Sequence, residues 1–260
     1  MVKILGVVVG FLLLVFAVTG VSASHSWGGY HWARTANPFT LRLGDNVSSA
    51  WDSYLTTASA DWTASSVLDT TVVAGQGGKS CRATAGRVEV CNKKYGNNGW
   101  LGIAQIWITG GEHITQGITK MNDTYFNTSR YNTPAWKRMV MCQEVGHTLG
   151  LDHQDEAFDN PNMGTCMDYT GDPDGPPSNE HPNAHDYEEL EAIYAHTDGF
   201  TTVSASTAQI ARHLGQLAAN GNLDSPGEWG RSVKDNGKVA VFERDFGFGN
   251  KLTTFVVWAN

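Results

Sequence analysis

The strongest constraint on this chain comes from the stretch MCQEVGHTLGLDH. Gln143 and His147 stand four residues apart, so on a helix they project from the same face, one turn apart. Glu144 is their neighbour in sequence but is rotated around the helix axis. Gly150 can adopt the positive φ that ends a helix, which would allow the chain to turn and bring His153 back to that face. The stretch therefore predicts a helix and a tight turn that gather polar side chains at one point.

The start of this helix is also readable. Thr133 is a good N-cap residue, and Pro134 suits the first helical position. Apolar residues then recur at helical spacing at Trp136, Met139, Val140 and Leu149.

From Glu144 onward the stretch fits the zinc-peptidase pattern H-E-x-x-H-x-x-G-x-x-H, with Gln143 where the first histidine normally stands. Catalytic zinc takes three protein ligands and keeps one position open for water. Gln143, His147 and His153 are the candidate ligands, and Glu144 is the candidate general base. The alternative is a buried helix that carries histidines by chance.

A second element, Gly164-Thr165-Cys166-Met167-Asp168-Tyr169, follows the third candidate ligand. With it, the chain resembles the metzincin clan of zinc endopeptidases over residues 133–169, and more loosely over residues 37–196. In that clan a tight turn places a methionine beneath the metal, which would be Met167 here. Astacin-like and serralysin-like members place a tyrosine near the metal, which would be Tyr169. The alternative for Met167 is a core-filling side chain.

The resemblance implies an α+β fold of the metzincin-like zincin type. Its parts would be a mixed twisted sheet, an active-site helix, the methionine turn and a C-terminal helix, here Asp186–Tyr194. In such a fold an edge strand binds the extended substrate by strand addition. The alternating and helical patterns predict strands at residues 38–46, 67–73, 87–92, 100–109 and 114–122, and a helix over Ser48–Ser65.

The N-terminus predicts a secreted protein. Residues 1–23 carry Lys3, an apolar run and the small-residue site Val21-Ser22-Ala23, which together are typical of a signal peptide. An uncleaved anchor is the alternative, since the apolar run approaches the ~18 residues of a membrane span. The formal net charge of −8 argues against nucleic acid or an anionic membrane as a partner. We expect a monomer that acts on peptide or protein substrates.

Four cysteines in an exported chain are expected to pair, and three connectivities are possible. We favour Cys81–Cys91, which would close a short loop, and Cys142–Cys166, which would join the metal helix to the turn bearing Met167. Free buried thiols are the alternative.

We divide the chain into a signal peptide (1–23), a catalytic domain (24–197) and a linker with a small β-rich extension (198–260). Within the extension, Ala208–Ala219 reads as a helix, and residues 239–242 and 252–258 read as paired strands. These strands form either a small subdomain or a hairpin added to the catalytic sheet.

Because Gln143 stands where a histidine is usual, three functions are open. A carboxamide oxygen reaches as far as imidazole but binds zinc more weakly. The first hypothesis is a secreted zinc metalloendopeptidase with one catalytic Zn²⁺. The second is a pseudo-peptidase that retains the fold, and the third is a secreted binding protein whose tail carries the function. Carboxylates around the turn could also hold Ca²⁺, namely Asp155, Glu156, Asp159, Asp168, Asp172 and Asp174. Other histidines belong to no ligand motif, although His181 and His185 could supply a substitute ligand.

Overall fold

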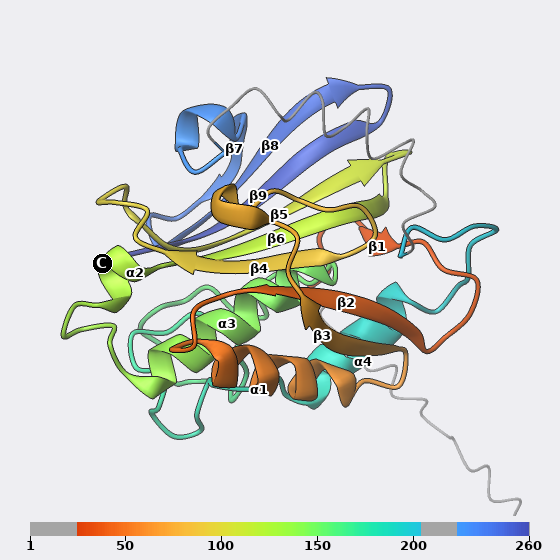
Figure 1. Cartoon of the computed structure of the whole chain (residues 1–260). Coiled ribbons are helices and arrows are strands. Elements are labelled where there is room, and N and C mark those ends of the chain that lie inside the picture. The colour runs from red at the N-terminus through yellow and green to blue at the C-terminus, as the bar shows by residue number, and fades with distance from the viewer. Residues whose placement is uncertain (1–24, 204–222, 260) are drawn as a thin grey trace, which may run out of the picture.

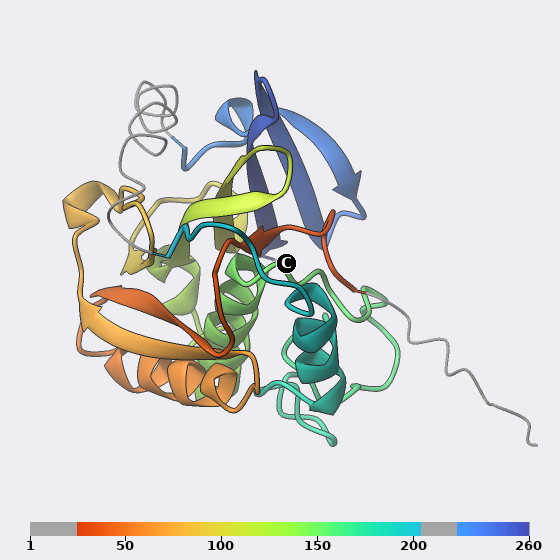
Figure 2. The ribbon, with the colours of Figure 1, turned by 90° about the vertical axis from the view of Figure 1, so that its right-hand side faces the viewer.

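The computed structural model describes residues 25–203 and 223–259. A mixed sheet of nine strands forms one layer, and the long helices lie across one of its faces (Figure 1, Figure 2). The helices are α1 (Asp52–Thr63), α2 (Asp123–Phe126), α3 (Pro134–Thr148) and α4 (Ala184–Ile193). The strands are β1 (His31–Trp32), β2 (Phe39–Asn46), β3 (Leu68–Ala74), β4 (Val88–Lys93), β5 (Trp100–Thr109), β6 (His113–Asn122), β7 (Arg231–Asp235), β8 (Val239–Gly247) and β9 (Asn250–Trp258).

The sheet has the order β3-β2-β4-β6-β5-β9-β8-β7, and β1 pairs separately with β6. Strands β2, β3, β4 and β6 pair in parallel, whereas β5 runs antiparallel to β6. This mixed sheet with few helices agrees with the predicted α+β class. Each predicted strand is present with small shifts at its ends.

Two predicted helices begin at different residues from those expected. The helix predicted from Ser48 begins at Asp52, because residues 48–51 form a turn closed by Trp51 N donating to Ser48 O at 2.7 Å. The helix predicted from Asp186 begins at Ala184. The Asn183 side chain caps this helix by accepting from the backbone N–H groups of His185 and Asp186. The Asp186 carboxylate accepts a hydrogen bond from the Asn183 backbone N–H, which completes a capping box.

The C-terminal strands form a hairpin added to the main sheet. Strand β9 pairs with β5 over nearly the whole length of both strands, from Trp100↔Trp258 to Ile108↔Lys251. Strand β5 therefore has a partner on each side. The antiparallel strand next to α3 is not at an edge, in contrast to the open edge that the resemblance implies.

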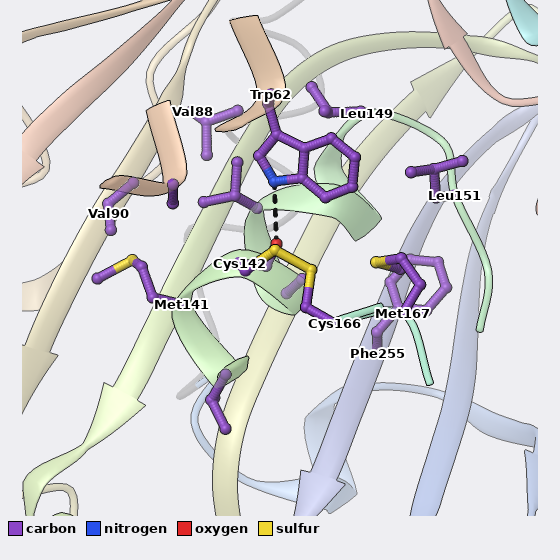
Figure 3. Packing of buried hydrophobic residues seen from close by; sticks show 14 of the residues in the cluster. Trp62, Val88, Val90, Met141, Cys142, Leu149, Leu151, Cys166, Met167 and Phe255 are labelled. Atoms are coloured by element: carbon purple, nitrogen blue, oxygen red, sulfur yellow. Dashed lines mark hydrogen bonds between the residues drawn. A yellow bond between two sulfur atoms is a disulfide. The ribbon is translucent and has the colours of Figure 1, made fainter. Parts of the chain in front are cut away.

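Both predicted disulfides are confirmed. Cys81 pairs with Cys91, and Cys142 pairs with Cys166. The second bridge fastens α3 to the turn that carries Met167, and Trp62 of α1 donates from Nε1 to the Cys142 carbonyl at 3.1 Å (Figure 3). By loop-closure entropy, a bridge spanning 24 residues is expected to contribute about 3–4 kcal/mol to stability.

Some predictions fall on residues outside the described ranges. They are the signal peptide over residues 1–23 and the helix Ala208–Ala219, and the proposed domain boundaries stay predictions. Within residues 25–203 and 223–259, no helix is long and apolar enough to cross a membrane.

Candidate metal centre

Helix α3 carries the candidate ligands and has the ends that its sequence predicts. At its start, Thr133 Oγ1 accepts a hydrogen bond from Trp136 N at 3.2 Å, and Pro134 occupies the first turn. At its end, Gly150 takes a φ of +102°, and a Cβ there would lie 2.1 Å from the Tyr30 carbonyl oxygen. Only glycine fits this turn, which brings the following chain back over the helix.

The turn brings the Nε2 atoms of His147 and His153 together, with the two rings nearly perpendicular. Their Nε2 atoms lie 3.1 Å apart, and both residues are buried. His147 Nδ1 lies 2.9 Å from the Leu151 carbonyl oxygen, and His153 Nδ1 lies 3.1 Å from Glu156 Oε1. Both acceptors call for a hydrogen on Nδ1, which leaves each Nε2 with a lone pair.

Two facing lone pairs repel each other unless a cation lies between them. A proton is a poor candidate, because desolvation lowers the pKa of His147 well below its usual value and the neighbouring His153 lowers it further. The separation of 3.1 Å is close to the roughly 3.3 Å expected between two nitrogen ligands of a tetrahedral zinc ion. A carboxylate behind a ligating histidine is also the usual arrangement in metal sites.

Gln143 presents its oxygen for a third bond. Its Nε2 donates to the Cys166 carbonyl at 2.8 Å, so the neighbouring disulfide-linked turn fixes the orientation of the amide. Oε1 is fully buried and has no hydrogen-bond partner among the described residues. An unpaired buried oxygen of this kind costs about 1–3 kcal/mol, a cost that a bound cation would remove. His147, His153 and Gln143 therefore offer two nitrogens and one oxygen as candidate metal ligands.

Glu144 is buried beside this set. Both carboxylate oxygens lack a hydrogen-bond partner among the described residues, and burial raises the pKa of the carboxyl well above its usual value. Strand β5 makes room for it at Gly102, where a Cβ would lie 2.5 Å from Glu144 Oε1. A nearby cation would favour the ionised form that a general base requires.

Burial of Glu144 predicts a specific pH dependence of the metal-free protein. The folded state holds a proton on Glu144 that the unfolded state loses above about pH 4.5. The free energy of unfolding should therefore fall as pH rises, by up to about 1.4 kcal/mol per pH unit. Glu144→Gln cannot titrate and should lack this slope. Urea unfolding in the presence of chelator, between about pH 5 and 8, measures the free energy of unfolding of both proteins. Any pH dependence that comes from His147 is the same in the parent and in Glu144→Gln, so it cancels in the comparison.

Parallel slopes for the parent and Glu144→Gln would contradict this prediction. They would mean that Glu144 is ionised in the folded metal-free protein.

The methionine turn packs directly beneath α3. Met167 is fully buried, and a Cβ at Gly146 would lie 2.6 Å from its sulfur. Met167 N also donates to Thr165 Oγ1 at 3.0 Å, which helps to hold the turn. Because residue 146 is glycine, the turn that carries Met167 can pack closely against α3. The role of Met167 beneath a metal stays a prediction.

The C-terminal hairpin covers the candidate centre. The ring of Phe255 on β9 stacks on His147 with centroids 4.4 Å apart and planes 4° from parallel. Tyr169 donates from its hydroxyl to the Trp258 carbonyl at 3.3 Å. Lys234 Nζ on β7 lies 2.8 Å from Glu156 Oε1, the carboxylate oxygen that faces His153. No local sequence signal predicts these contacts, since Lys234, Phe255 and Trp258 lie far along the chain from the helix.

A cavity of about 370 Å³ lies between the loop that follows His153 and the loop that follows Tyr169. It is lined by the loop around Phe158 and by the loop around Gly171 and Pro176.

The other ligand candidates lie elsewhere or are already engaged. His181 Nδ1 lies 2.7 Å from Asp61 Oδ2, so its ring faces α1 and not the histidine pair. Among the calcium candidates, Asp155 accepts from Ala157 N, and Asp168 accepts from Met163 N, both at 2.9 Å. A calcium site in this loop stays a prediction.

The comparisons with known proteins leave the family open. No family model and no curated protein sequence matches this chain. Among solved structures, the chain is similar to the structure of myroilysin, with 10% identity and a TM-score of 0.37. That match covers 64% of this chain and 83% of the other. A likeness of this size does not establish a shared fold or function.

Proposed function

We propose that this protein is a secreted zinc-dependent metalloendopeptidase in a latent form. The observation that carries the proposal is the buried His147–His153 pair, whose Nε2 atoms face each other at 3.1 Å while both Nδ1 atoms are held by acceptors. Gln143 Oε1 would be the third ligand. The two disulfides accord with an oxidising compartment.

Each residue of the centre has a role in this proposal. When bound, zinc would supply a water whose pKa is lowered toward about 7. Glu144 would accept the proton of that water during attack on the peptide carbonyl, and would then pass it to the departing amine. Tyr169 would donate its hydroxyl hydrogen to the developing oxyanion once the Trp258 carbonyl had moved away.

The latent form follows from the position of β9. Strand β5 runs beside Glu144 at Gly102, so a peptide added to β5 would pass directly over the centre. Strand β9 is paired at this position, and its Phe255 covers His147. Cleavage of a protein substrate therefore requires the hairpin to leave β5.

The test is cleavage of an unstructured protein by the purified chain. The zinc-loaded protein should cleave slowly, through the fraction of molecules in which the hairpin has left β5. Chelator or His147→Ala should remove at least about 99% of that rate, because two ligands cannot retain a catalytic zinc ion. His181→Ala is the matched control, since this histidine is 49% exposed and faces Asp61. Cleavage that survives both chelator and His147→Ala would refute the proposal.

Gln143→His should raise zinc affinity by about tenfold or more, because imidazole is a stronger zinc donor than a carboxamide oxygen. Competition with a chromophoric chelator measures this affinity. Unchanged affinity would show that residue 143 does not bind the metal, and would direct attention to Glu144 or a water as the third ligand.

A second candidate function is a metal-binding pseudo-peptidase. The pairing of β5 on both sides favours it, because no strand edge is then open beside the centre. This candidate predicts bound zinc and no cleavage at any stage of hairpin displacement. The binding-protein hypothesis, in which the tail carries the function, has no specific observation in its favour.

A further inference from the structure

A second group of metal-ligating side chains lies apart from the histidine pair. It joins His31 on β1, His113 at the start of β6, and His196 and Asp198 in the segment after α4. The Nε2 atoms of the three histidines lie 3.5, 3.3 and 3.8 Å from one atom, Asp198 Oδ1. The Nε2 atoms of His31 and His196 are 3.2 Å apart.

These distances resemble the edges of a zinc coordination shell. Ligands at about 2.0–2.1 Å from a tetrahedral zinc ion are separated by roughly 3.3 Å. The donor atoms of His31, His196 and Asp198 all lie within 4.8 Å of one another. A small inward movement of these three side chains would place a cation at bonding distance from each.

The surroundings prepare these groups to act as ligands. His31 Nδ1 lies 2.8 Å from the Gly29 carbonyl oxygen, which calls for a hydrogen on Nδ1 and leaves the lone pair on Nε2. Asp198 Oδ2 is bound by the Arg34 guanidinium at 3.1 Å, so Oδ1 is the oxygen turned to the histidines. An outer hydrogen bond on each ligand is typical of metal sites.

We propose that His31, His196 and Asp198 form a second zinc site that serves structure. Two imidazoles and one carboxylate are a donor set suited to Zn²⁺. His113, whose Nε2 lies 3.3 Å from Asp198 Oδ1, would hold that carboxylate from outside the ligand set. His196 is 55% exposed and gives the ion access from solvent.

The site would tie three distant segments together. Asp198 N donates to the Arg34 carbonyl, and Thr202 N donates to the Ala33 carbonyl, both at 2.8 Å. The ion would lock this backbone pairing. Trp32, the residue after His31, donates from Nε1 to the Thr148 carbonyl at 2.9 Å, at the last turn of α3. The structural zinc would thereby support the end of the helix that carries the first centre.

The test is zinc stoichiometry of the full-length mature chain after chelation, reloading and gel filtration. The parent should bind about two ions, and His147→Ala/His153→Ala should bind about one. Adding His196→Ala to that double variant should abolish binding and remove the zinc-dependent rise in Tm. His181→Ala should still bind about two ions, as the matched control. Because His196 is largely exposed, its truncation should leave the fold intact.

Cobalt gives an independent readout in the same proteins. His147→Ala/His153→Ala loaded with Co²⁺ should show the visible absorption of a tetrahedral site, and Asp198→Asn should weaken or remove it. The proposal is overturned if His147→Ala/His153→Ala binds no zinc, or if its one ion is unaffected by His196→Ala. If the parent binds one ion that depends on His196 alone, the peptidase proposal fails and the structural site stands.

Discussion

Glu144→Gln is expected to lower kcat for peptide hydrolysis by about 10²- to 10⁴-fold while the zinc content stays at the parent level. The substitution keeps the size and shape of the side chain but removes the basic oxygen. Because Glu144 is fully buried and makes no hydrogen bond to the described residues, glutamine loses no protein contact. The drop in rate would therefore report on proton transfer.

The measurement separates chemistry from folding. Steady-state kinetics on a fluorogenic peptide should show KM close to the parent value, with the loss in kcat, since Glu144 holds no part of the substrate in this proposal. Tm and zinc content control for damage to the centre. A variant that keeps its zinc and retains more than about a tenth of the parent kcat would exclude Glu144 as the general base.

Local sequence signals were sufficient for the scaffold of the centre. Thr133 and Pro134 predicted the first turn of α3, and Gly150 predicted its end, because caps and positive φ are properties of a few neighbouring residues. The Cys142–Cys166 pairing followed from the expectation that the helix and the methionine turn meet. The strands were predicted from the alternation of their own side chains.

These local signals do not predict contacts between segments that are far apart in the sequence. Phe255 lies on an alternating strand, but nothing in that strand says that it pairs with β5 or that its ring covers His147. The His31–His113–His196–Asp198 group was missed for the same reason. His31, His113 and His196 belong to no ligand motif in the sequence, yet the β1–β6 pairing and the segment after α4 bring them together. The short spacing of His196 and Asp198 was the one available hint.

The pairing of β9 with β5 leads to the second large prediction. Gln105 and Thr254 are partners across the two strands, joined by a hydrogen bond of 3.0 Å from Gln105 Nε2 to Thr254 Oγ1. A disulfide formed by Gln105→Cys and Thr254→Cys would lock the hairpin in place. With β9 locked, a peptide cannot add to β5, and Phe255 stays on His147. The oxidised double variant should therefore cleave an unstructured protein at least about 100-fold more slowly than its reduced form.

The comparison is internal, because one protein is assayed before and after mild reduction. The parent chain under the same reductant controls for the native bridges. Recovery of cleavage on reduction would identify hairpin release as the activating step. Equal rates in the two forms would mean that substrate reaches Glu144 without displacing β9, and strand addition to β5 would then be excluded as the mode of binding. No cleavage in either form, with zinc bound, would instead support the pseudo-peptidase. A centre that does not cleave once the engineered bridge is open lacks the catalytic chemistry.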